Sequence, residues 1–168
     1  GHIFLNLDDL NIRKISKEIH RRQITFGFNS KNRFQITDAK LENGIQKFQL
    51  IDHNNKKQYK FSTNLSGRHN LYNVTAAICV AIEENISVKD IAKGLANFRG
   101  VGRRFELSEV YFSNHPHVLI DDYGHHPAEI LSTILAAKEK FPRQKICMIF
   151  EPHRFTRTQQ LFDDFKKV

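Results

Sequence analysis

The sequence contains only two cysteines, Cys79 and Cys147, in 168 residues. Cys79 lies in an apolar helical pattern and Cys147 in a strand pattern, so we expect both to be small core residues. This scarcity argues against a disulfide or a cysteine metal site and fits a reducing cytosol. The sequence also has no run of about eighteen apolar residues, and no basic and then apolar leader precedes the first predicted strand. We therefore expect a cytoplasmic chain that neither crosses a membrane nor is exported.

Several signatures of catalytic and binding sites are missing as well. The sequence has no Gly-x-x-x-x-Gly-Lys-Ser/Thr loop to hold the β- and γ-phosphates of a nucleotide, and no serine at a strand-to-helix elbow. His125 and His126 are adjacent, but neighbouring histidines on a turn diverge, and no third ligand has zinc-like spacing. We therefore predict neither a serine hydrolase nor a metal site.

The formal net charge is +8 and the isoelectric point is near 9.6, which suggests an anionic partner. The basic residues are scattered, however, and adjoin only in pairs such as Arg21-Arg22, Lys56-Lys57 and Arg103-Arg104. A solvated basic surface with a nucleotide or phosphate site therefore explains the charge better than a nucleic-acid patch does. With 40% hydrophobic and 26% charged residues, the chain has the composition of a globular protein with a real core.

The periodicity of the apolar residues changes along the chain. Residues 3–7 and 24–28 are predicted to be strands, and short alternating runs between residues 33 and 65, separated by turn residues, predict an antiparallel meander. A helical period follows from Asn70, and a second helix is expected to begin after Ser87.

We place a domain boundary near Glu106, so the predicted domains are residues 1–106 and 107–168. In the second domain, the three apolar residues 118–120 predict a short buried strand, and residues 145–150 predict another. Each strand is followed by polar residues and then by a helical pattern, the later one over residues 159–168. This order predicts two consecutive β-loop-α units.

The polar residues of these two units follow their strands directly. Asp121-Asp122 ends the first strand, Gly124 allows a tight turn, and Pro127 stands where a helix would begin. Because ligands bind at the carboxyl edge of open α/β sheets, we expect both loops to line one cleft. Its expected members are His125, His126, His153, Arg154 and Arg157.

Four motifs of the sequence occur in the order typical of one family. They are Gly67-Arg68-His69-Asn70-Leu71-Tyr72-Asn73, Gly102-Arg103-Arg104-Phe105-Glu106, Asp121-Asp122-Tyr123-Gly124-His125-His126-Pro127 and Pro152-His153-Arg154-Phe155-Thr156-Arg157-Thr158. Together they resemble the ATP-dependent Mur ligases of bacterial cell-wall synthesis, with Glu151 where the family is expected to have glutamine. The resemblance implies an α/β fold: the latter half of an ATP-binding central domain, with helices and an antiparallel β-meander, followed by an incomplete Rossmann-like, amino-acid-binding domain.

The resemblance also implies that the chain is a fragment, because the family's P-loop and UDP-sugar domain would lie upstream of Gly1. Two β-loop-α units are too few for a closed α/β domain, so we expect truncation at the other end too. By resemblance, the full-length protein would join L-alanine to UDP-N-acetylmuramate in peptidoglycan biosynthesis, with ATP hydrolysis, an acyl-phosphate intermediate and Mg²⁺. Most residues that hold the metal would be absent from the fragment, which we expect to be inactive alone.

Four residues are expected at the nucleotide. Asn70 and Asn73 lie one helical turn apart, and a carboxamide both donates and accepts, as the edge of adenine requires; the matching asparagines of the family hold the base. Arg104 suits bidentate contact with phosphate or ribose oxygens, and the resemblance assigns Asp122 to the ribose. From the residues alone, the two asparagines could equally be helix caps, and Asp121 and Asp122 could cap the following turn.

A second group is expected at the amino-acid substrate. Arg154 and Arg157, three residues apart on one loop, make a carboxylate clamp, and a neutral His125 can accept a hydrogen bond from an incoming amine. By resemblance, this site receives the carboxylate of L-alanine. Tyr123 and His126 stand next to it.

Two other functions stay open. A sister Mur ligase that attaches intact peptides to UDP-N-acetylmuramate in muropeptide recycling shares the asparagine and arginine motifs. A non-catalytic basic module that binds nucleic acid is favoured only by the net charge. We expect small-molecule substrates, no nucleic acid and no membrane.

Overall fold

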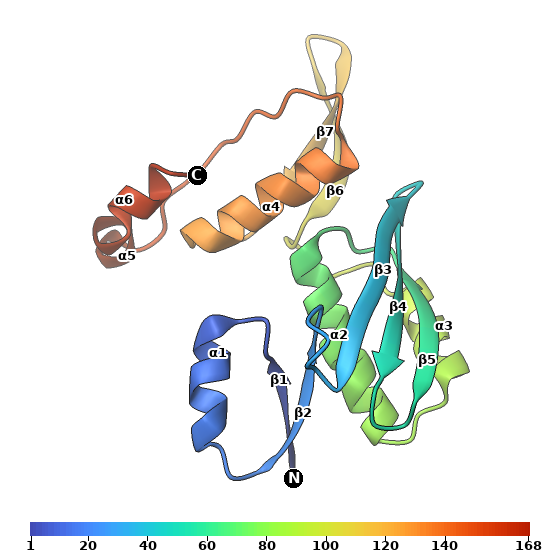
Figure 1. The fold of residues 1–168 in the computed structure, drawn as a ribbon. Helices are drawn as coiled ribbons and strands as arrows, with labels where there is room; N and C mark the ends of the chain where they lie inside the picture. The colour runs from blue at the N-terminus through green and yellow to red at the C-terminus, as the bar shows by residue number, and fades with distance from the viewer. The chain divides into compact units, whose positions relative to one another are not determined.

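The first part of the chain forms five strands: β1 (His2–Asn6), β2 (Arg22–Gly27), β3 (Phe34–Glu42), β4 (Ile45–Asp52) and β5 (Lys57–Thr63). The computed structural model describes all of residues 1–168 (Figure 1). The five strands make one mixed sheet in the order β1-β2-β3-β4-β5. β1 pairs with β2 and β2 with β3 in parallel, whereas β3, β4 and β5 form the predicted antiparallel meander.

Alternating residues decide which face of the meander is buried. In β4, Phe48 and Leu50 are buried, whereas Lys47 is exposed. The turn from β3 to β4 consists of Asn43 and Gly44, whose φ angles of 51° and 78° are those of a type I′ hairpin. The period of two that predicts the meander therefore turns one of its faces towards the core.

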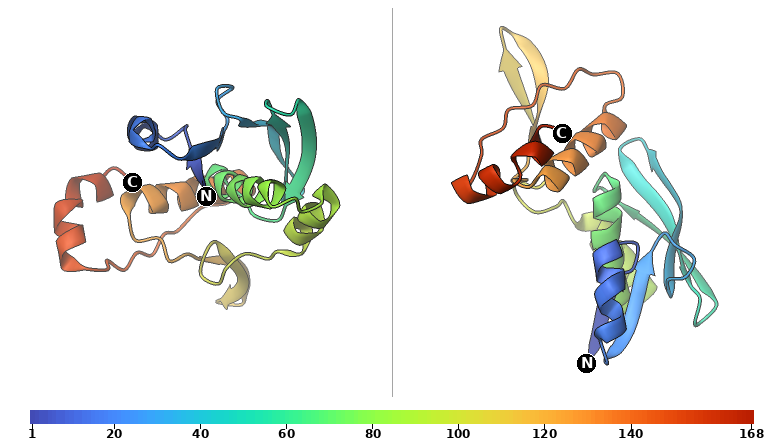
Figure 2. Two further views of the ribbon diagram at one scale, coloured as in Figure 1. Left: turned by 90° about the horizontal axis from the view of Figure 1, so that it is seen from below. Right: turned by 60° about the vertical axis from the view of Figure 1, so that its left-hand side comes forward.

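Three helices and a short 3₁₀ turn complete this part of the chain: α1 (Leu10–Ile15), the turn Ser16–Glu18, α2 (Arg68–Glu83) and α3 (Val88–Asn97). α2 lies against β1 and β2, and α3 lies against β5 (Figures 1 and 2). The Ser87 hydroxyl accepts from the backbone N–H of Asp90, which confirms the predicted start of α3. The core cluster consists of Ile24, Phe26, Phe34, Ile36, Phe48, Leu50, Phe61, Leu71, Val74, Ile78, Cys79 and Ile91.

Residues 1–98 and 99–168 form two compact units. The second unit contains β6 (Glu106–Phe112), β7 (His115–Asp121), α4 (Pro127–Lys140), α5 (Phe155–Gln160) and α6 (Phe162–Phe165). β6 and β7 form an antiparallel hairpin, and α4 begins at the predicted proline, with His126 as its N-cap. The predicted α/β class is confirmed, and the domain boundary near Glu106 stays a prediction.

Several expectations for the second unit are wrong in this structure. Residues 145–150 form no strand, and the helix predicted over 159–168 is divided into α5 and α6. Val118 and Leu119 of β7 are 45% and 46% exposed, not buried. A buried parallel strand needs neighbours at its edges and helices over both faces, and β7 pairs only with β6. The apolar pattern of Leu161 and Phe165 spans too few turns to hold one continuous helix without such packing.

The two cysteines are unpaired and lie in different environments. Cys79 is buried in α2, and burial raises the pKa of its thiol. Cys147 is exposed, so its expected place in a core is wrong, because the strand that would have carried it does not form. No helix of the structure has both the length and the apolar composition needed to cross a bilayer.

Candidate functional site

Gly67 starts the helix that carries two of the predicted nucleotide-binding residues. Its φ of 95° lies in the region that favours glycine, and its carbonyl oxygen accepts from the backbone N–H groups of Asn70 and Leu71. α2 therefore begins at Arg68, and Asn70 and Asn73 lie in its first two turns. The helix expected from Asn70 therefore forms and begins two residues earlier, and the binding role of the two asparagines stays a prediction.

The carboxamide of Asn70 is partly used by the protein itself. Its Nδ2 donates to the carbonyl oxygen of Ser66 at 2.7 Å. A carboxamide has two N–H groups and one carbonyl oxygen, so one N–H and the oxygen remain for a ligand. The Asn73 side chain is exposed. No side chain caps the start of α2, and neither carboxamide accepts from one of its free backbone N–H groups. The helix-capping alternative therefore gains no support.

Asp122 joins two of the four motifs. Its Oδ2 accepts from the backbone N–H of Phe105 at 2.8 Å, and its Oδ1 accepts from that of Gly124, also at 2.8 Å. The backbone N–H of Tyr123 donates to the carbonyl oxygen of Arg103 at 2.8 Å. The arginine loop is thereby tied to the end of β7, which places the exposed Arg104 beside that strand end. The turn-capping alternative for Asp122 describes part of what its carboxylate does.

Arg103 is exposed to solvent and contacts residues at the end of β7. Its guanidinium lies over the ring of Tyr123, 5.2 Å from the centroid, and its Nε is 3.5 Å from Oδ2 of Asp121. Both contacts are largely exposed, so they guide the side chain more than they stabilise the fold.

Three rings from the two predicted loops lie together in the second unit. The ring of His125 is 5.3 Å from that of Tyr123 and 6.4 Å from that of His153, and Tyr123 and His153 are 6.5 Å apart. Nδ1 of His125 lies 2.9 Å from the carbonyl oxygen of Tyr123. A carbonyl can only accept, so Nδ1 donates, and in the neutral ring Nε2 then carries the lone pair. The tautomer matches a histidine that accepts from an amine.

His126 serves the helix that follows it. Its Nδ1 accepts from the backbone N–H of Ala128 at 3.2 Å, and Glu129 accepts from the backbone N–H of His126 at 3.1 Å, which completes a capping box. Burial alone would raise the pKa of Glu129. Hydrogen bonds from the backbone N–H groups of His125 and His126 outweigh that effect, and the pKa lies below its ordinary value. The charged carboxylate thus holds the turn in front of α4.

The two arginines of the predicted clamp both belong to the start of α5. Arg154 is its exposed N-cap, with a φ of 70°, and Arg157 lies half-buried in its first turn. No hydrogen bond or ion pair joins either guanidinium to His125. The structure therefore brings His125 and His153 together, and the clamp itself stays a prediction.

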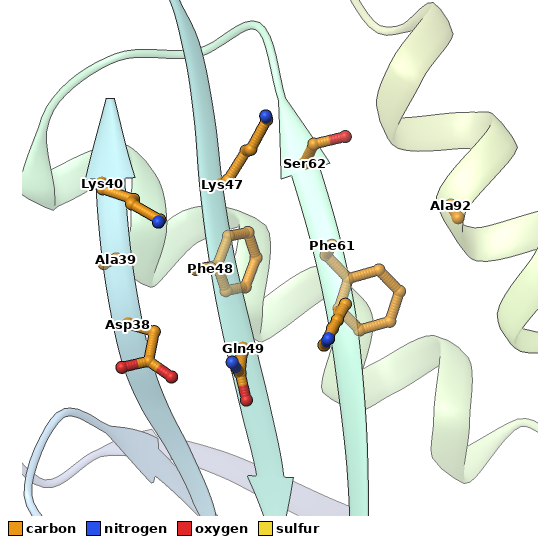
Figure 3. Close-up of a pocket in the computed structure, with 10 residues that line it drawn as sticks. Asp38, Ala39, Lys40, Lys47, Phe48, Gln49, Phe61, Ser62 and Ala92 are labelled. Carbon is orange, nitrogen blue, oxygen red and sulfur yellow. The ribbon is translucent and has the colours of Figure 1, made fainter. Parts of the chain in front are cut away.

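A groove of about 660 Å³ lies over the meander and contains none of the predicted site residues. Figure 3 shows Lys40, Lys47 and Ser62 along it. Glu42 pairs with Lys40 at 3.1 Å and with Lys47 at 2.7 Å, so much of the positive charge there is already balanced. In the whole structure, no group of three or more histidine, cysteine, aspartate or glutamate side chains could hold a metal ion.

Sequence reasoning gave no role to Asp8, which contacts α2 close to the two asparagines. The signal was present, because the pair Asp8-Asp9 stands near the end of β1, as Asp121-Asp122 stands at the end of β7. At each of these two strand ends, one member of the acidic pair, Asp8 or Asp122, accepts from two backbone N–H groups.

The fold defines the class of the chain: an α/β protein with a mixed sheet, a covering helix that starts at a glycine, and polar loops after its strands. Residues 1–81 match the family of the Mur ligase middle domain. Together with the relatives described next, this match shows that the chain belongs to the Mur ligase family.

The similar proteins described here all carry the name of one enzyme. A UDP-N-acetylmuramate–L-alanine ligase of Methylobacillus flagellatus is 41% identical over 176 residues, which cover 100% of this chain and 36% of that protein. The ligase of the same name from Buchnera aphidicola is also 41% identical, over 179 residues, with the same coverage. The crystal structure of a UDP-N-acetylmuramate-alanine ligase from Thermotoga maritima superposes with a TM-score of 0.68 at 29% identity, covering 82% of this chain and 31% of that one. The chain thus spans about a third of the length of the relatives it matches.

Proposed function

We propose that this chain is part of a cytoplasmic, ATP-dependent ligase that joins L-alanine to UDP-N-acetylmuramate. The observation that carries the proposal is the 41% identity, over all of the chain, to relatives that are named for this reaction. The motif residues also lie at helix starts and strand ends, where side chains are open to a ligand, and this supports the proposal.

In the first unit, Asn70 and Asn73 are the residues proposed for the adenine base. In the second unit, Asp122 and Arg104 are the residues proposed for the ribose and the phosphates. Asn70 keeps one N–H and its oxygen for the edge of adenine, and Asn73 is open to solvent. Each oxygen of Asp122 accepts one backbone hydrogen bond and has a second lone pair for a ribose hydroxyl. Arg104, on the loop that Asp122 holds, supplies a fork of N–H donors for phosphate or ribose oxygens.

The amino acid would bind at the loops that follow β7 and precede α5. Two cationic forks, on Arg154 and Arg157, suit a carboxylate. Nε2 of His125 can accept from the amine of alanine and so orient it for attack. The rings of Tyr123 and His153, packed against His125, restrict the orientation of that imidazole.

When bound, ATP would supply the phosphoryl group that activates the carboxylate of the sugar nucleotide, and Mg²⁺ would spread the developing charge. The residues of this chain hold the base, the ribose and the amino acid. Their contribution to rate would come from orienting the amine and excluding other nucleophiles.

A chimera tests the proposal, with residues 1–168 in place of the matching segment of the Methylobacillus flagellatus relative. We expect phosphate release that depends on L-alanine in the presence of ATP and UDP-N-acetylmuramate. The same assay with a tripeptide in place of alanine separates the muropeptide-ligase alternative.

A further inference from the structure

One carboxylate, that of Asp8, joins three elements of the first unit. Asp8 follows β1, and its oxygens accept from the backbone N–H groups of Phe28 at 2.6 Å and Asn29 at 3.1 Å, directly after β2. Its Oδ2 also accepts from the hydroxyl of Tyr72 in α2 at 3.0 Å. The ends of two neighbouring parallel strands are thereby tied to the start of the helix that carries Asn70 and Asn73.

The space around this carboxylate is closed on the side of β2. A Cβ atom at Gly27 would lie 2.6 Å from Oδ1 of Asp8, closer than any side chain tolerates. Nδ2 of Asn32 donates to the same oxygen at 3.2 Å. Four hydrogen bonds and the glycine thus fix where the carboxylate lies, and Tyr72 is the only one of its donors that comes from a helix.

Tyr72 is also held on its other sides. Its ring meets that of Phe28 edge to face, with centroids 5.4 Å apart. The guanidinium of Arg68 covers the Phe28 ring at 3.9 Å, and its Nε donates to the Tyr72 hydroxyl at 3.3 Å. Arg68 and Tyr72 are four residues apart, so they share one side of α2. That side is anchored to the strand ends.

The anchored side determines where the two asparagines point. Tyr72 lies between Asn70 and Asn73 in the sequence, and a helix has 3.6 residues per turn, so a rotation of α2 that breaks the Tyr72 contact turns both carboxamides with it. We propose that Asp8 and Tyr72 are positioning residues, which hold the start of α2 in the rotation at which Asn70 and Asn73 meet an adenine base. The inference rests on the proposed function, because it assumes that these asparagines bind the base.

The test is a titration of the ¹⁵N-labelled 168-residue chain with ATP, followed through the side-chain amide signals of Asn70 and Asn73. Tyr72→Phe keeps the ring and its packing on Phe28 but removes the hydroxyl that bonds Asp8. We expect this variant to remain folded and to bind ATP about five- to tenfold more weakly, because a single intramolecular hydrogen bond contributes about 1 kcal/mol and about 1.4 kcal/mol is tenfold in affinity. The amide signals of both asparagines should also shift in the absence of ATP.

Tyr59→Phe is the matched control. Tyr59 is a partly buried tyrosine of β5 that packs beside Phe61 and is not bonded to Asp8. This variant should bind ATP as the wild-type chain does. Asp8→Asn is the second variant, and it should weaken ATP binding in the same direction, with little added loss when combined with Tyr72→Phe.

The outcomes separate this inference from the proposed function. Equal ATP affinity in the wild-type chain and Tyr72→Phe would overturn the positioning role and leave the adenine site standing. An absence of any ATP response at Asn70 and Asn73, both in the wild-type chain and in the chimera that restores the phosphate-binding loop expected upstream of Gly1, would remove the adenine site, and the positioning role with it. Unfolding of both variants while Tyr59→Phe stays folded would assign the contact to folding alone.

Discussion

The backbone N–H of Phe105 donates to Oδ2 of Asp122 at 2.8 Å, so the arginine loop and the end of β7 share one carboxylate. Seventeen residues separate the two. The same side chain also receives the N–H of Gly124, which begins the histidine turn. Two motifs that are distant in the sequence are therefore positioned by a single residue.

Removing this carboxylate should loosen the arginine loop. In the chimera, we expect Asp122→Ala to raise the apparent KM for ATP by about ten- to a hundredfold, because hydrogen bonds to a charged group contribute about 1.5–3 kcal/mol and about 1.4 kcal/mol is tenfold. Steady-state kinetics at varied ATP measures the effect. Asp121→Ala is the control, since Asp121 makes only an exposed ion pair with Arg103 and should change little. Equal effects of the two substitutions would contradict the role of Asp122.

If Arg154 belongs to a carboxylate clamp, its removal should weaken the use of alanine selectively. In the chimera, Arg154→Ala should raise the apparent requirement for alanine far more than that for ATP, by about 2–4 kcal/mol of lost charge-assisted bonding. Arg143→Ala removes another exposed positive charge and should leave both requirements unchanged. If Arg154→Ala affected ATP and alanine equally, the clamp assignment would be withdrawn.

Two glycines should respond to alanine in opposite ways. Gly27→Ala places a Cβ atom 2.6 Å from the Asp8 carboxylate and should lower the free energy of unfolding by about 1–3 kcal/mol. Gly94 lies inside α3, where a Cβ would meet nothing within 4 Å, so Gly94→Ala should raise it by about 0.5–1 kcal/mol. Urea unfolding of the 168-residue chain checks both signs. A tolerated Gly27→Ala would show that the Asp8 carboxylate can move.

The Asp8 carboxylate should make stability depend on pH. Burial raises its pKa, but hydrogen bonds from Phe28, Asn29 and Tyr72 lower it to below the ordinary value of 3.8. A pKa depressed by folding means that the contribution is present above about pH 4 and is lost as the pH falls through the folded-state value. The difference in unfolding free energy between the wild-type chain and Asp8→Asn should therefore be largest near pH 7 and smaller at pH 3. A constant difference would be inconsistent with this titration.

Local signals were sufficient for much of the fold. The alternation of apolar residues predicted the meander, the helical period from Asn70 predicted α2 to within two residues of its start, and Pro127 predicted the start of α4. Each of these depends on residues within a few positions of one another, which is where turn and capping chemistry acts.

Contacts between residues that are distant in the sequence could not be predicted. The Tyr72–Asp8 hydrogen bond spans 64 positions, and neither residue type alone indicates its partner. Burial also depends on neighbours: residues 118–120 and 145–150 have the composition of buried strands, but β7 has one partner and the later segment has none. The packing of His153 against His125 was expected from the edge rule for α/β sheets, although the sheet that the rule assumes does not form.

The most direct measurement is phosphate release by the chimera with ATP and UDP-N-acetylmuramate, in the presence and absence of L-alanine, beside the unmodified Methylobacillus flagellatus relative. Release that depends on alanine is the predicted result, and it would show that residues 1–168 supply a working nucleotide and amino-acid site. A folded chimera that releases no phosphate with alanine, while the unmodified relative does, would contradict the proposed function.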